Sequence, residues 1–221
     1  MADVPPSHAE CVKLRSHLLR APPVIFGAGA IGRQVALQLV GLGIAELRVF
    51  DSRRVNQSDV FGGFRPNDIG RPRADVLAEL CFEANPRLNF QSGQMTMESA
   101  VTKSSAVFCC VDTVNERRRI WKLVQSCCGF WSDVRTIRSR AYVFMAFDQR
   151  SRRRYARLLR SRASPGGSGR RTTPANVCIA CVAASIAVYQ LVSFLRRRPV
   201  PFEVDFDVAT GRASNMGGDG V

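Results

Sequence analysis

The stretch VIFGAGAIGRQVALQLVGLGIAELRVFD, residues 24–51, decides the fold of this chain. An apolar run enters a turn that contains Gly27, Gly29 and Gly32. A helical pattern follows, and a second apolar run ends on Asp51. This order is typical of a β-α-β unit, in which glycines let the backbone approach a phosphate and the closing acid binds ribose hydroxyls. The stretch predicts a nucleotide site without choosing among NAD, FAD, S-adenosylmethionine and ATP.

The composition is that of a globular domain with an excess of arginine. The chain has 221 residues, 46% hydrophobic and 23% charged, which suffices for one domain with a full core. Its net charge is +14, and only Lys13, Lys103 and Lys122 among the 32 basic residues are lysines. Such an excess favours an anionic partner such as phosphate, nucleic acid or an acidic protein, although a general bias towards arginine would look the same.

Helical and apolar patterns alternate after residue 51. We expect a Rossmann-like α/β fold, with a mostly parallel sheet flanked by helices and added antiparallel strands towards the C-terminus. The organisation that we expect is a leading helix over 1–20, a nucleotide-binding domain over 21–207 and a flexible tail over 208–221. Within the domain, the arginine-, serine- and glycine-rich stretch at about 149–176 is expected to be a mobile loop.

One apolar run, residues 177–195, is uncharged over 19 residues and is followed by three arginines. Its length would allow a membrane span. Because Ser185, Tyr189 and Gln190 interrupt it and it stands alone, we expect a helix buried against the sheet and no membrane partner. The eight cysteines are too sparse for a disulfide scaffold, and MADVPPSHAE lacks the pattern of a secretory signal, so we expect a cytoplasmic protein.

The loop after the second predicted strand narrows the choice of ligand. Asp51, Val55 and Ser58 are followed by the tripeptide DIG at 68–70. This order and spacing resembles the ThiF/MoeB/HesA superfamily, the adenylating fold shared with ubiquitin-activating enzymes. The resemblance covers roughly residues 20–205 and includes the segment FCCVDTVNERRRIW and the late apolar run.

The resemblance implies ATP-dependent adenylation, in which a carboxylate attacks the α-phosphate and pyrophosphate leaves. The carboxylate is usually the C-terminal glycine of a ubiquitin-like or sulfur-carrier protein, which is the implied partner, and relatives generally form homodimers. The glycine turn, Asp51 and Ser58 would cradle the nucleotide. Asp112 matches the acid that holds Mg²⁺ in the family. The alternative is that Asp112 caps the helix that follows it.

The cation set departs from the family pattern. The family's asparagine in this loop is Asp59 here, its triphosphate-binding arginine is Gly62, and its lysine is Arg73. Arginine can replace lysine as a phosphate clamp, so Arg73 remains a candidate catalytic and nucleotide-binding residue. Glycine supplies no charge. The loss of one preorganised contact of this kind lowers the reaction rate by a factor of about 10²–10³.

Another arginine must therefore substitute, and Arg53, Arg54 and Arg65 lie in the same loop. If no arginine substitutes, the alternative to an adenylating enzyme is a ThiF-like nucleotide-binding protein that acts as a non-catalytic partner subunit. A nicotinamide-dependent oxidoreductase is a third hypothesis, but the chain shows no Tyr-x-x-x-Lys after the glycine turn.

Cysteine and arginine clusters raise two further hypotheses. In many relatives a cysteine near the late helix forms a thioester with the activated carboxylate. Cys178 is the candidate for this role here, and the alternative is that Cys178 is a buried core residue. Cys178 and Cys181 form a single CxxC, and both histidines lie in the first twenty residues, so we do not expect zinc. The run 138–162 has one acid among many arginines, which fits an acidic carrier protein, nucleic acid or a solvated loop.

Overall fold

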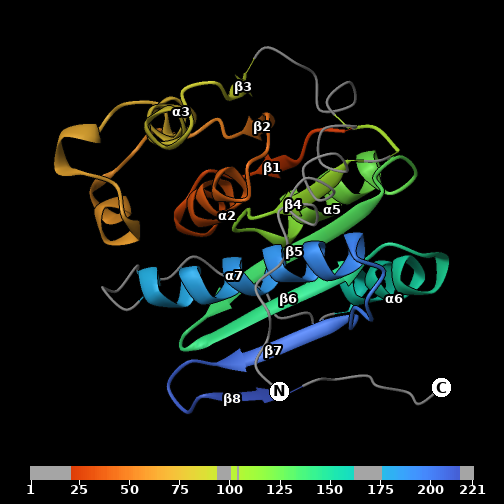
Figure 1. Ribbon diagram of the computed structural model, residues 1–221. Helices are drawn as coiled ribbons and strands as arrows, with labels where there is room; N and C mark the ends of the chain where they lie inside the picture. Colours follow the sequence, from red (N-terminus) through yellow and green to blue (C-terminus); the bar gives the residue numbers. More distant parts are fainter. Residues whose placement is uncertain (1–20, 94–100, 104, 162–175, 215–221) are drawn as a thin grey trace, which may run out of the picture.

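The computed structural model describes residues 21–93, 101–103, 105–161 and 176–214. Within these residues an eight-stranded sheet runs in the order β3-β2-β1-β4-β5-β6-β7-β8 (Figure 1). Its strands are β1 (Val24–Phe26), β2 (Glu46–Phe50), β3 (Asn89–Ser92), β4 (Ala106–Cys109), β5 (Phe130–Ile137), β6 (Arg140–Ala146), β7 (Glu203–Asp207) and β8 (Arg212–Ser214). The first five strands in spatial order are parallel and the last three are antiparallel, which confirms the expected Rossmann-like sheet.

Helices cover both faces of the sheet. They are α2 (Ala30–Gly41), α3 (Arg73–Ala84), α5 (Val114–Val124), α6 (Gln149–Arg160) and α7 (Asn176–Leu195), with the short 3-10 helices η1 (Gln57–Gly62) and η2 (Pro66–Asp68). Ile25 packs in one core with α2, α3 and α7, whereas Val24 and Phe26 pack in a second core with α5 and α6. The period-two alternation of the strand therefore separates two cores on opposite faces.

The late apolar run forms α7 and lies against α2, β5 and β6 (Figure 1). Its buried residues include Ile179, Ala183, Ala187 and Leu191, at the spacing of one helix face. Of the described helices, this one is long and apolar enough to cross a membrane by length and composition. Its packing confirms the prediction of a helix buried against the sheet.

Two boundaries in the expected organisation are wrong. Residues 149–160 form the helix α6 and not a loop, because Asp148 caps its N-terminus and Tyr155 and Leu159 bury one face. The tail is not wholly flexible, since β8 pairs with β7. The predicted leading helix over 1–20, and residues 162–175 and 215–221, lie outside the described residues.

The glycine at position 32 is required by packing. A Cβ atom at this position would lie 1.7 Å from the carbonyl oxygen of Gly27, so Gly32→Ala must displace the turn. We expect this variant to lower the free energy of unfolding by at least about 1–3 kcal/mol in urea denaturation. Gly41→Ala is the matched control, because no atom lies within 4 Å of its Cβ position and α2 gains about 0.5–1 kcal/mol from alanine. Equal stability of the two variants would contradict this packing argument.

Candidate nucleotide site

The candidate site lies at the carboxyl ends of β1, β2 and β4. The N–H of Gly27 donates to the carbonyl of Phe50 at 2.8 Å, and the N–H of Cys110 donates to the carbonyl of Phe26 at 2.7 Å. These bonds bring together the loops that follow the three strands. Because α2 follows β1 on one face and α5 follows β4 on the other, this edge is the switch point at which open α/β sheets bind ligands.

The glycine turn combines close packing with an open helix end. Gly27 has a φ of +95°, and a Cβ atom there would lie 2.8 Å from the carbonyl oxygen of Cys110. Gly29 is the N-cap of α2, which has no side-chain cap. The nearest described atom to a Cβ at Gly29 would be Nη1 of Arg73, 3.7 Å away. The first turn of α2 therefore keeps the free N–H groups that attract anions.

Asp51 closes over this turn. Its Oδ2 accepts the N–H of Ala28 at 2.7 Å, and its Oδ1 accepts the N–H of Arg53 at 2.7 Å. Its side chain is only 2% exposed, and Nη1 of Arg73 lies 3.8 Å from Oδ2. The carboxylate thus joins the end of β2 to the glycine turn, and its ribose contact stays a prediction.

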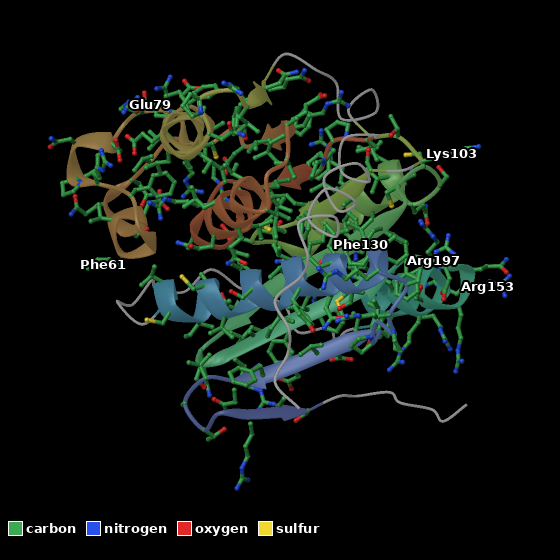
Figure 2. The ribbon with its side chains drawn as sticks, in the orientation of Figure 1. Phe61, Glu79, Lys103, Phe130, Arg153 and Arg197 are labelled. Atoms are coloured by element: carbon green, nitrogen blue, oxygen red, sulfur yellow. The ribbon has the colours of Figure 1, made fainter. Side chains whose placement is uncertain are left out.

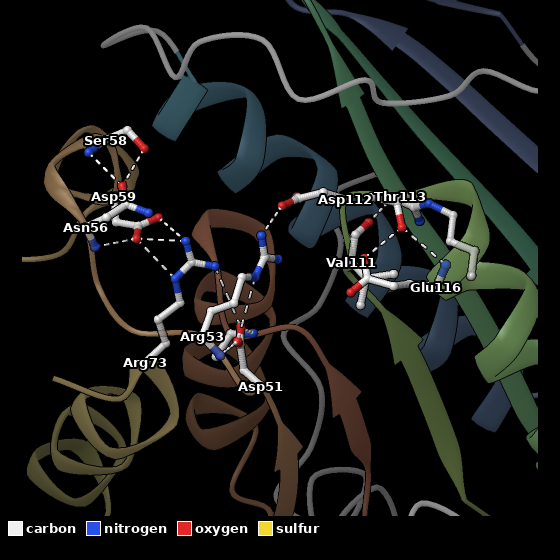
Figure 3. A network of polar contacts seen from close by, with 12 residues as sticks. Asp51, Arg53, Asn56, Ser58, Asp59, Arg73, Val111, Asp112, Thr113 and Glu116 are labelled. Atoms are coloured by element: carbon white, nitrogen blue, oxygen red, sulfur yellow. Dashed lines mark hydrogen bonds and ion pairs between the residues drawn. The ribbon is translucent and has the colours of Figure 1, made fainter. Parts of the chain in front are cut away.

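Asp59 and Arg73, two of the departures from the family pattern, form a buried pair with each other (Figure 3). Nη2 of Arg73 lies 2.6 Å from Oδ1 and 2.7 Å from Oδ2 of Asp59, and Nε lies 3.1 Å from Oδ2. Asp59 also accepts the N–H of Asn56 at 2.8 Å. The pair therefore ties η1 to the start of α3, and only Nη1 of Arg73 faces the glycine turn.

Arg53 bridges the acids of two strands (Figure 3). Its Nη1 donates to Oδ2 of Asp112 at 2.6 Å, and its Nε lies 3.9 Å from Oδ1 of Asp51. Burial alone would lower the pKa of Arg53, but the hydrogen bond and charge of Asp112 outweigh it and raise the pKa. Arg53 is therefore a charged group between Asp51 and Asp112.

Asp112 does not cap the following helix. Thr113 does so, since its Oγ1 accepts the N–H of Glu116 at 3.2 Å and donates to Oε2 of Glu116 at 2.8 Å. The alternative assignment of Asp112 as a helix cap is therefore wrong. Its carboxylate is 57% exposed and points towards Arg53.

A buried network that the sequence did not reveal supports this loop. Arg117, on α5, donates from Nη2 to the carbonyl of Val111 and from Nη1 to Asp133. Asp133 also accepts from Nε of Arg135 at 2.8 Å and from the Tyr155 hydroxyl at 2.7 Å. All four of these side chains are buried. The one signal in the sequence was a charged pair inside the apolar strand FWSDVRTI.

The structure does not bring every predicted residue into the site. Ser58 is exposed and donates to Oδ1 of Asn56 at 2.6 Å. Arg65 is exposed, and its backbone N–H, not its guanidinium, bonds Asp68. Arg54 donates to the carbonyl of Gly70 at 2.8 Å. Of the three candidate substitute arginines, Arg53 alone has a guanidinium bonded to a site acid in the described part of the chain.

The surroundings of Cys178 differ from one of the two expectations, and Arg33 is a further partly buried residue near the site. Cys178 is exposed on α7, so the alternative of a buried core cysteine is wrong, and its thioester role stays a prediction. Arg33 is half-buried beside the loop, since a Cβ at Gly63 would lie 2.6 Å from its Nη1. Burial lowers the pKa of Arg33, and its Nε has no hydrogen-bond partner among the described residues.

The donor set fits magnesium better than zinc chemistry. Among the described residues no group of three or more histidine, cysteine, aspartate or glutamate side chains could hold a metal ion. Mg²⁺ needs fewer protein ligands, because it is commonly held by one or two carboxylates together with substrate phosphates. The exposed carboxylate of Asp112, which pairs with Arg53 in this structure, would meet that requirement.

The fold and this edge define a Rossmann-like α/β domain. The sequence matches the ThiF family over residues 8–214, and the chain belongs to this family. It is 28% identical over 110 residues to the sulfur carrier protein ThiS adenylyltransferase of Escherichia coli K12, a match that covers 47% of this chain and 44% of that protein. The chain thus spans less than half of this curated relative.

Solved structures share the fold. The crystal structure of E. coli MccB with ATP has a TM-score of 0.67 at 16% identity, covering 93% of this chain and 66% of MccB. The crystal structure of PaaA has a TM-score of 0.68 at 18% identity, covering 93% of this chain and 75% of PaaA. At these identities the likeness concerns the fold alone.

Proposed function

We propose that this chain uses ATP and Mg²⁺ to adenylate the C-terminal carboxylate of a small ubiquitin-like or sulfur-carrier protein. The observation that carries the proposal is the arrangement of Arg53, Arg73, Asp51 and Asp112 around the glycine turn. Membership of the ThiF family and the named activity of the ThiS adenylyltransferase support it.

Each part of the site has a chemical task in this proposal. The N–H groups at the start of α2, with Gly27, Gly29 and Gly32 shaping the turn, bind the phosphates. Asp51 accepts from the ribose hydroxyls. Nη1 of Arg73, the part of its guanidinium not bonded to Asp59, contacts a phosphate oxygen.

Arg53 replaces the family arginine that is Gly62 here. An arginine at position 62 would not fit unchanged, because its Cβ would lie 3.1 Å from the Cβ of Ala30. Arg53 supplies the missing charge from the other side of the turn. Asp112 would hold Mg²⁺, which would supply positive charge to the phosphates, and Arg53 would contact the triphosphate.

The reaction is a substitution at the α-phosphorus. An oxygen of the substrate carboxylate forms a bond to this phosphorus, the bond to the bridging oxygen breaks, and pyrophosphate leaves with the electron pair. The chain's own contribution is to orient the phosphates and neutralise the charge that develops on them.

The seven cysteines of the described part are free thiols, which supports a reducing cytoplasm as the location.

Pyrophosphate exchange tests the role of Arg53. We expect Arg53→Gln to lower the rate of ATP–pyrophosphate exchange about 10²–10³-fold. The rate is measured with a carrier protein that ends in Gly-Gly. Arg54→Gln removes the same charge from the neighbouring residue, whose guanidinium points to Gly70, and should keep the wild-type rate within a few-fold. Equal rates of the two variants would remove Arg53 from the machinery.

The alternative function is a nucleotide-binding partner subunit without adenylation activity. The buried pair of Asp59 and Arg73 favours it, because this pair neutralises the cation at the family's lysine position. Stabilisation of the wild-type protein by ATP, together with no exchange for any Gly-Gly substrate, would decide for this alternative.

A further inference from the structure

We propose that the outer surface of α5 and α6 binds the phosphate backbone of nucleic acid. We call it the basic face and define it by five exposed residues: Arg119, Lys122, Arg153, Arg157 and Arg160. Figure 2 shows Arg153 extending from α6 away from the sheet. The inference does not rest on the proposed function, and the site at the glycine turn takes no part in it.

Two other arginines fix the helices that carry this face. Nε of Arg118, on α5, donates to the carbonyl of Leu159 at the end of α6 at 2.8 Å. Arg152, on α6, donates to the carbonyls of Gln125 and Cys128 after the end of α5, at 2.5 and 2.7 Å. The two antiparallel helices thus cap each other's carboxyl ends, which ties the two helices together.

The five cations of the basic face remain available. None of them forms an ion pair or a side-chain hydrogen bond within the part of the chain that the structure describes. Arg153, Arg157 and Arg160 follow one another at helical spacings of four and three, and α6 contains no acid. Like charges at these spacings destabilise a helix. A polyanion bound along the helix would offset that repulsion by attracting all three arginines.

The second helix extends the face in width. Lys122 follows Arg118 by one turn of α5, so it lies on the side of α5 that faces α6. Arg119 is exposed beside it. Together the two helices present cations over a surface and not along a single line.

The absence of apolar anchors favours nucleic acid over an acidic protein. The large exposed hydrophobic residues of the described chain are Phe61, Ile69, Phe82 and Tyr189, and none of them lies on α5 or α6. Protein interfaces depend on a desolvated core of apolar and aromatic residues. Binding to a phosphate backbone needs only cations that release condensed counterions.

The salt dependence of binding to a short mixed-sequence DNA duplex tests the proposal. Fluorescence anisotropy should show that the wild-type chain binds, with log Kobs falling linearly against log salt. Exchanging Arg153, Arg157 and Arg160 together for glutamine should reduce that slope by about 2.7, or about 0.9 for each lost phosphate contact. Exchanging the same three residues for lysine should retain the slope.

A charge-matched variant controls for net charge. Exchanging Arg87, Arg138 and Arg212 for glutamine removes the same three charges from exposed positions outside the basic face, and the wild-type slope should persist. Equal losses in the two glutamine variants would overturn the proposal. So would displacement of the duplex by polyglutamate at equal charge concentration, because it would identify an acidic polypeptide as the preferred ligand.

Discussion

Asp133→Asn is expected to lower the free energy of unfolding by about 3–5 kcal/mol, the usual cost of removing one partner of a buried ion pair. Asp133 bonds the buried guanidinium groups of both Arg117 and Arg135. The substitution removes the buried negative charge that pairs with both of these guanidinium groups. Urea denaturation followed by circular dichroism measures the difference.

Two control variants separate the loss of this buried charge from the loss of a single hydrogen bond and from the loss of a more exposed ion pair. Tyr155→Phe removes one hydrogen bond to Asp133 and should cost about 0.5–1.5 kcal/mol. Asp205→Asn breaks the more exposed pair with Arg140 and should cost about 0–1 kcal/mol. A loss at Asp133 no larger than at Asp205 would show that the network is not a stability determinant.

The same carboxylate predicts a pH dependence. Burial alone would raise the pKa of Asp133, but the charges of Arg117 and Arg135 outweigh it, and the pKa of the folded state lies below the ordinary value. The unfolded chain therefore takes up the proton at higher pH, near its ordinary pKa of about 3.9. The stabilisation is complete above this pH and is lost as the pH falls through the folded value. Asp133→Asn should remove this part of the acid transition.

Asp51→Ala is expected to abolish stabilisation by ATP and to lower pyrophosphate exchange by at least about 10²–10³. Asp51 lies between the glycine turn, Arg53 and Arg73, and its loss removes the predicted ribose acceptor as well as the bond from Ala28. Thermal shift with ATP and Mg²⁺ and with AMP measures binding separately from chemistry.

Asp75→Asn provides the charge-matched control for Asp51. Asp75 is exposed in the first turn of α3, and ATP should stabilise this variant as it does the wild type. Because Asp51→Ala also loses a structural hydrogen bond, Asp51→Asn is measured beside it, since the amide oxygen can still accept from Ala28. Full ATP stabilisation of both Asp51 variants would place the nucleotide elsewhere.

The chain's local patterns predicted most of the fold. The glycine turn, the alternating strands and the amphipathic helices are periodic features, and their order alone implied a parallel sheet with antiparallel additions. Helix α6 was missed because six arginines in twelve residues hid the contacts of Tyr155 and Leu159 with the core. The family resemblance also singled out Asp51 and Asp112, which follow β2 and β4 on either side of β1.

What the sequence by itself determined is therefore the fold class, the glycine turn and the set of charged residues at one edge of the sheet. Only the tertiary structure decided how these charges pair: Arg73 with Asp59, Arg53 with Asp112, and Arg117 with Asp133. The partners are 14, 59 and 16 residues apart in the chain, so no local period relates them. Whether an arginine is a free cation or a neutralised one depends on which loops the sheet brings together.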